Sequence, residues 1–171
     1  YQPKVEAFEY FTKGIQLLLE FVTKRDNNET LLIAAEMFQK AISIDTGYVD
    51  AITGLAHVYW TYGAFSGDEG EAYFALSDSV LSIAEKLDSN TPYSLYLKGF
   101  VSLDPDSGFY FLKKAYDLDP YNVGSPLLVN KLINSGFHNL SLTLCNRYLE
   151  RDPLNPILRD WQVSSLWNMG Q

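Results

Sequence analysis

The 171-residue sequence is 47% hydrophobic and 15% aromatic, which excludes an intrinsically disordered chain. Its formal net charge of -8 argues against a nucleic-acid partner, because phosphate binding needs clustered Lys and Arg. No apolar run approaches the roughly 20 residues of a membrane span, so we expect no transmembrane segment. The sequence starts at Tyr1 and ends at Gln171, just past an expected helix. We therefore expect a piece of a longer protein, in which missing targeting signals carry little weight.

Four helices are predicted in the N-terminal half, where apolar residues recur at helical spacing. The first is expected over about 3–24, the second up to 44, the third up to 63 and the fourth over 68–87. Asn28, in the break before the second helix, is of a type that caps helices. Gly63 suits the position just past a helix C-terminus, and Asp68 with Glu71 resembles a capping box.

Five further helices are predicted in the C-terminal half, where proline residues punctuate the pattern. Thr91-Pro92 and Asn155-Pro156 each combine a capping residue with a proline in the first helical turn. The first of these helices is expected to start at 92 and to end before 104. The other four are expected over about 107–118, 124–135, 137–151 and 156 to the end. No segment alternates with the period of two that is typical of strands. The prediction is an all-α fold with about nine helices.

A repeat appears when the turns that close alternate helices are aligned. The turns are Asp45-Thr46, Asp88-Ser89, Asp119-Pro120 and Asp152-Pro153. They are separated by 43, 31 and 33 residues, near the period of about 34 typical of one class of helical repeat. The same pattern recurs ahead of each turn: a small residue, then a large one four positions on, then a small one three positions after that. Ala34, Phe38 and Ala41 fit this pattern best. Small residues let two helices approach closely, while large ones fill the groove between them.

This pattern resembles the tetratricopeptide repeat (TPR). The residues that carry the resemblance occupy its small, aromatic and turn positions: Ala34, Phe38, Ala41, Leu55, Ala56, Tyr59, Gly99, Ala115, Pro120 and Pro153. The resemblance implies a right-handed superhelical solenoid of antiparallel helix pairs in a single domain, 1–171. Its four pairs and final helix would cover about 3–46, 47–89, 90–120, 121–153 and 154–171. The segment KAI-x-ID-x2-Y followed by GLA-x2-Y also resembles repeat segments attached to bacterial cyclase- or kinase-type signalling proteins.

The TPR resemblance implies a protein-interaction scaffold in which the first helix of each pair lines a concave groove. The positions that would face this groove are His57, Trp60, Tyr93, Tyr96, Phe100 and Asn130. Some of these aromatic residues could instead pack between repeats. The family's best-known groove holds a peptide carboxylate with Lys, Arg and Asn, and of these only Asn130 is present. We therefore predict an aromatic groove without a basic carboxylate clamp, which binds a hydrophobic or basic segment of a partner protein.

Charge supports an expectation of basic partners, because the sequence has no Lys or Arg between Lys40 and Lys86 but seven Asp and Glu residues there. A plain solvated acidic face is the alternative interpretation. The compartment is not determined, with the cytoplasm favoured.

Enzymatic chemistry is not predicted. The sequence lacks a phosphate-binding glycine loop, an HExxH zinc helix and a GxSxG turn, so we expect no enzyme, metal or cofactor. His138 and Cys145 lie seven residues apart without a third group to orient them. Cys145 is the only cysteine and is expected to be a buried apolar residue.

The last helix offers a second hypothesis, because it carries too many apolar residues for one buried side. A repeat array needs a polar cap at each end, and this helix lacks a following partner. It would close the array, or pair with more of the chain or with a second copy in a homo-oligomer. Self-association within a larger signalling protein is therefore the alternative function. An independent enzyme is the third and least favoured function.

Overall fold

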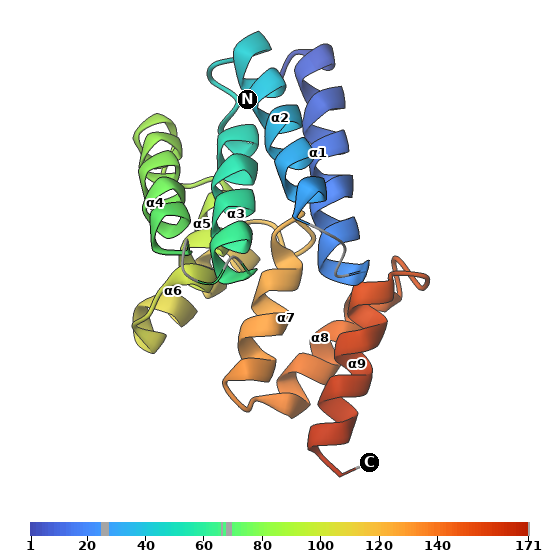
Figure 1. Ribbon diagram of the computed structural model, residues 1–171. Coiled ribbons are helices and arrows are strands. Elements are labelled where there is room, and N and C mark those ends of the chain that lie inside the picture. The colour runs from blue at the N-terminus through green and yellow to red at the C-terminus, as the bar shows by residue number, and fades with distance from the viewer. Residues whose placement is uncertain (25–27, 66, 68–69, 171) are drawn as a thin grey trace. The chain divides into compact units, whose positions relative to one another are not determined.

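The computed structural model describes residues 1–24, 28–65, 67 and 70–170. Within these ranges the chain forms nine helices and no strand (Figure 1). The helices are α1 (Val5–Lys24), α2 (Glu29–Ile44), α3 (Val49–Phe65), α4 (Gly70–Leu87), α5 (Pro92–Val101), α6 (Pro105–Leu118), α7 (Ser125–Asn134), α8 (His138–Leu149) and α9 (Pro156–Asn168). The predicted all-α class is confirmed.

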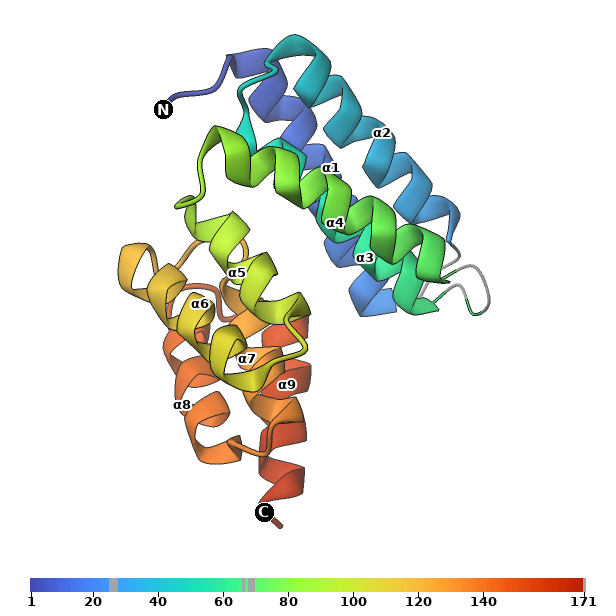
Figure 2. The same ribbon diagram turned by 90° about the vertical axis from the view of Figure 1, so that its left-hand side faces the viewer.

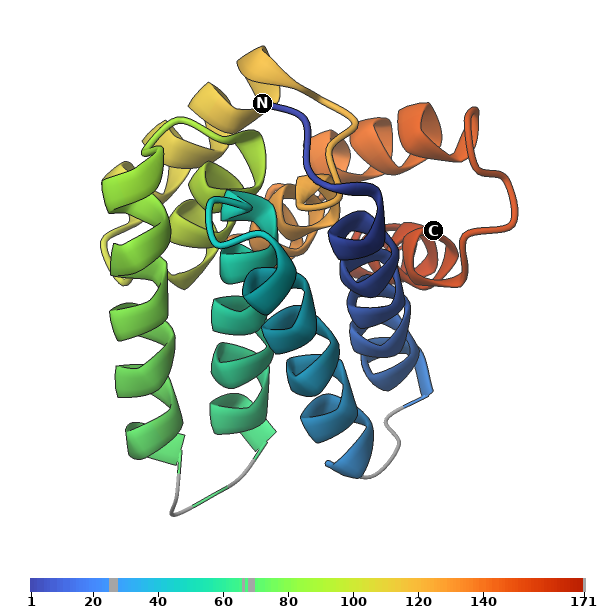
Figure 3. The same cartoon turned by 90° about the horizontal axis from the view of Figure 1, so that it is seen from above.

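The helices belong to two compact units, Tyr1–Ser94 and Leu95–Gln171. In the first unit, α1 to α4 are neighbours in chain order, since α1 packs on α2, α2 on α3 and α3 on α4. Figure 3 shows these four helices as a row in which each reverses the direction of the one before. In the second unit α7, α8 and α9 pack on one another (Figure 2). The prediction of a single domain stays a prediction.

Phe38 holds the first three helices together. It projects from α2, is fully buried, and lies between Gly14 of α1 and Gly54 of α3. A methyl group on Gly14 would lie 2.8 Å from Cε1 of the Phe38 ring, and one on Gly54 would lie 2.4 Å from the same atom. The ring therefore occupies the space that these two glycines leave open, which is the close packing that the repeat pattern predicts.

Gly63 corrects one predicted boundary, because α3 continues past it to Phe65. A methyl group on Gly63 would lie 2.9 Å from the carbonyl oxygen of Gly70 at the start of α4. Gly63 is thus needed for the close approach of two helices, not to end one. The helix thus extends two residues beyond its predicted end, and Asp68 of the predicted capping box lies outside the described residues.

Capping side chains set two helix starts in the second unit. Asp104 caps α6 by accepting a hydrogen bond from the Ser107 backbone N–H at 3.0 Å, and Pro105 occupies the first turn. The predicted start at Ser107 was therefore two residues late. Asn155 caps α9 in the same way, accepting from the Leu158 N–H at 3.1 Å. The prolines that follow α6 and α8 lie in turns, as expected.

Gly99 of α5 and Gly108 of α6 bring these two helices into backbone contact. A methyl group on Gly99 would lie 2.7 Å from the carbonyl oxygen of Gly108. Leu112 and Ala115, the large and small residues of this repeat, are fully buried. Between α8 and α9, the buried hydroxyls of Ser141 and Ser165 form a hydrogen bond of 2.7 Å.

Candidate functional site

Two of the predicted groove residues of the first unit, His57 and Tyr93, contact each other. His57 and Trp60 lie half-buried on α3, whereas Tyr93 is buried at the start of α5. The Nδ1 atom of His57 lies 2.9 Å from the Tyr93 hydroxyl, which can donate its proton to the neutral imidazole. Desolvation lowers the pKa of His57 to about 4, so the ring is neutral at physiological pH. This pair therefore provides a hydrogen bond within the unit.

The predicted groove residues of the second unit are also engaged within it. Tyr96 is fully buried, and its hydroxyl donates to the Asp119 carbonyl oxygen at 3.3 Å. Phe100 and Asn130 are half-buried, and the Asn130 side-chain oxygen accepts a hydrogen bond of 2.8 Å from Asn134. Tyr93 and Tyr96 thus lie in the interior. The assembly of all six residues into one groove stays a prediction.

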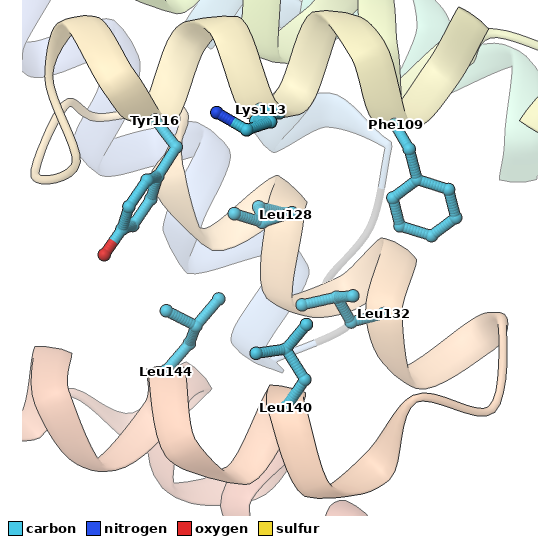
Figure 4. A pocket seen from close by; sticks show the side chains of 7 residues that line it. All are labelled: Phe109, Lys113, Tyr116, Leu128, Leu132, Leu140 and Leu144. Carbon is cyan, nitrogen blue, oxygen red and sulfur yellow. The ribbon is translucent and has the colours of Figure 1, made fainter. Parts of the chain in front are cut away.

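An apolar cavity opens in the second unit, between α6 and α8 and above α7 (Figure 4). Its volume is about 390 Å³. Its lining is Phe109, Lys113 and Tyr116 from α6, Leu128 and Leu132 from α7, and Leu140 and Leu144 from α8. Figure 4 shows the four leucines and Phe109 directed toward a common space. Such an enclosure of leucine and phenylalanine side chains suits an apolar group and offers almost no hydrogen bonds.

Polar contacts hold the side chains at the mouth of this cavity. Lys113 forms an ion pair with Asp117 one turn along α6, with 2.5 Å between the nitrogen and the carboxylate oxygen. Arg147 of α8 donates a hydrogen bond to the Tyr116 hydroxyl, which ties α8 to α6. The basic groups therefore sit at the rim, and the interior stays apolar.

Leucine exposure distinguishes the floor of the cavity from its open side. Leu132 of α7 is only 3% exposed and forms part of the floor, whereas Leu140 of α8 is 51% exposed. Beside the cavity, the rings of Phe109 and Phe137 meet edge to face with centroids 5.6 Å apart, and Phe137 is also exposed. An exposed aromatic and aliphatic surface next to an apolar cavity is typical of sites that bind proteins or ligands.

Sequence reasoning missed this cavity, although its residues follow helical spacing. Phe109, Lys113 and Tyr116 are four and three residues apart on α6, and Leu140 and Leu144 are four apart on α8. Periodicity places each set on one helix face. It does not reveal that the two faces leave a gap between them.

Other kinds of site have less support in the described part of the chain. No group of three or more His, Cys, Asp and Glu residues could hold a metal ion there. None of its helices is long and apolar enough to cross a membrane. Burial raises the pKa of the Cys145 thiol to about 11, which keeps the sulfur protonated and unreactive.

A solved structure described as a thermophilic TPR protein, from Thermus thermophilus, matches the chain with a TM-score of 0.62. The match covers 94% of this chain and 99% of that one, at 20% sequence identity. The chain has a tetratricopeptide-repeat fold. The predicted resemblance and the all-α solenoid of helix pairs are thereby confirmed. No family model matches the sequence, and no curated protein matches it. The hint of a signalling protein stays a prediction.

Proposed function

We propose that the chain is a protein-interaction scaffold and that the α6–α8 cavity receives apolar side chains from an amphipathic segment of a partner protein. The observation that carries this proposal is the open, leucine-lined cavity of about 390 Å³. This volume lies within the range of typical ligand-binding clefts. The apolar interior favours aliphatic or aromatic side chains and disfavours charged ones, whose desolvation would not be compensated.

Apolar burial sets the scale of the expected affinity. One fully buried Leu or Phe side chain contributes ~1.5–3 kcal/mol, so two would contribute ~3–6 kcal/mol before the entropic cost of association. Even the upper figure corresponds to a dissociation constant of roughly 40 µM. The cavity would therefore act as an anchor, and neighbouring surface would supply the remaining contacts.

The predicted groove stays a separate candidate surface for binding a partner. Trp60 and Phe100 are half-buried aromatic residues and keep part of their surface available. Tyr93 and Tyr96 would offer a partner little surface, since both are buried and hydrogen-bonded. We expect Trp60→Ala to weaken peptide binding with little change in thermal stability. Unfolding of this variant would instead assign Trp60 to the core.

A peptide library displayed on phage tests the cavity directly. The immobilised chain should enrich sequences with apolar residues at helical spacing, and Leu140→Lys should abolish their binding by placing a charge at the opening. Leu76→Lys is the matched control, because Leu76 is 46% exposed on α4 of the other unit. Both variants should retain the helical circular dichroism spectrum. Equal binding of the enriched peptides to the wild-type chain and Leu140→Lys would contradict the proposal.

Self-association through α9 is the second candidate function. On this helix Val163 is 62% exposed and Trp167 is 80% exposed, so two large apolar side chains face away from the unit. Light scattering over a range of concentrations should detect a dimer that Trp167→Lys dissociates. A strict monomer throughout that range would count against this function.

A further inference from the structure

The net negative charge of the chain lies in one of the two units. Residues 1–94 contain six Lys and Arg residues against fourteen Asp and Glu residues. Residues 95–171 contain seven of each. The whole formal charge of -8 therefore belongs to the first unit, where it favours the approach of a basic partner.

The first unit also has a cavity, of about 480 Å³, where the turn after α2 meets the turn after α4. Both turns close a helix pair, so the repeat itself brings them together. The residues that matter for its chemistry are Tyr1, Tyr48, Asp50, Asp88, Asn90 and Thr91. The lining thus combines two carboxylates, two aromatic rings and polar side chains, unlike the leucine lining of the α6–α8 cavity.

Asp50 is the unusual group in this cavity. Its Oδ1 atom is buried and has no hydrogen-bond partner in the described part of the chain. Desolvation raises the pKa of the Asp50 carboxyl, and the charge of Asp88 raises it further, whereas the nearby Thr91 hydroxyl lowers it. Buried polar atoms are nearly always paired in folded proteins. An unpaired carboxylate oxygen beside a second carboxylate is therefore suited to receive a donor with a positive charge.

Aromatic side chains of Tyr1 and Tyr48 also line the cavity. Tyr48 is buried, and its ring lies 6.2 Å from that of Tyr1 and 5.1 Å from that of Phe11. Ring faces and apolar edges suit a methylene chain that ends in a charged group.

We propose that this cavity binds the ammonium group of a lysine side chain carried by a basic segment of a partner protein. The three N–H donors of the ammonium would reach the Asp50 and Asp88 carboxylates, while the aliphatic stem would lie against Tyr48. A hard metal ion is a poorer match, because Ca²⁺ takes six to eight oxygen ligands, and no group of three or more His, Cys, Asp and Glu residues in the described part of the chain could hold a metal ion. The inference shares with the proposed function only the premise that the chain binds proteins.

Proton linkage follows from the position of Asp50. The ammonium favours the ionised carboxylate, so binding should lower the pKa of Asp50 and should strengthen as pH rises through that pKa. The other titratable groups that face Asp50 are Asp88, from the end of α4, and the hydroxyls of Tyr48 and Tyr93. Burial raises the pKa of both tyrosines, so neither titrates in the acid range.

Titration of the isotopically labelled full chain with Nα-acetyl-lysine methylamide tests the site by NMR. The probe should shift the amide resonances of Gly47, Asp50 and Asn90. Asp50→Asn should weaken binding by about tenfold or more, because it removes a charge-assisted hydrogen bond. Asp78→Asn is the matched control, since it removes one exposed carboxylate of the same unit. The norleucine analogue, which lacks the ammonium, should not bind.

Three results would overturn the inference: no shifts at these turns, equal binding of the norleucine analogue, or unchanged binding by Asp50→Asn. Stronger binding of the arginine analogue would overturn the choice of ammonium. If Asp50→Asn does not fold, Asp88→Asn replaces it, since Asp88 is exposed. The pKa of Asp50 is then measured in the wild-type chain with and without the probe, which should lower it. Leu140→Lys should leave this titration unchanged, so failure here is distinguishable from failure of the α6–α8 proposal.

Discussion

Gly54→Ala should destabilise the first unit, although alanine is the better helix former. The added methyl group would lie 2.4 Å from Cε1 and 2.7 Å from Cζ of the Phe38 ring. Carbon atoms pack best at about 3.5–4.0 Å, so the ring would have to move by roughly 1 Å or more. It has little freedom to do so, because Phe38 is fully buried and Gly14 of α1 already approaches the same part of the ring.

Two opposing terms set the magnitude of this effect. Overpacking of a buried core costs about 1–3 kcal/mol, and the geometry here points to the upper end. Replacing glycine by alanine inside a helix gains about 1 kcal/mol. We therefore expect the free energy of unfolding to fall by about 1–2 kcal/mol, measured by urea denaturation followed by circular dichroism. For cooperative unfolding of a unit of this size, Tm should fall by roughly 4–15 °C.

Phe38→Leu provides the control for this reasoning. Leucine is smaller, so Gly54→Ala should be less destabilising in that background. The double-mutant cycle should show a coupling of at least about 0.5 kcal/mol. Strict additivity, or a Gly54→Ala variant as stable as the wild-type chain, would refute the claim that the Phe38 ring fills the space left by these glycines.

Three further predictions concern the backbone contact, the buried histidine and the cysteine. Gly99→Ala should destabilise the second unit in urea denaturation, because its methyl group would lie 2.7 Å from the Gly108 carbonyl oxygen, and backbone cannot move aside as a side chain can. A variant as stable as the wild-type chain would contradict this. The neutral form of His57 is favoured by folding, so the stability that it contributes is present above pH 6.5 and lost as pH falls toward 4. His57→Gln should accordingly lose less stability than the wild-type chain between about pH 7 and pH 4.5, and equal losses would count against desolvation of His57. Cys145 is buried, and its thiol pKa is raised to about 11, so it should react with a thiol reagent at about pH 7.5 only after urea unfolds the chain. Rapid labelling of the folded chain would show instead that Cys145 is accessible.

Much of the fold was predictable because its determinants are local. Helical periodicity, capping residues and the small-large-small pattern located every helix of the described chain, and the Ala34–Phe38–Ala41 pattern named the residue that fills the first interface. The boundary error at Gly63 has a physical cause. Gly63 can end a helix or permit close approach, and only the neighbouring Gly70 of α4 decides between these roles.

The candidate sites were less predictable, because each depends on how separate elements meet. The α6–α8 cavity arises where side chains of three separate helices meet. The exposure of Tyr93 and Tyr96 could not be inferred from their register, since a groove-facing position and a hydrogen-bonded interior position share the same helical spacing. The unpaired Asp50 oxygen depends on two turns that lie about 40 residues apart in the sequence.

The most direct test of the scaffold proposal is an NMR map of the full chain bound to a peptide selected from the phage library. We expect the largest shifts at the resonances of Phe109, Tyr116, Leu132, Leu140 and Leu144, around the α6–α8 cavity. Shifts confined to other surfaces, with these residues unchanged at saturation, would contradict it.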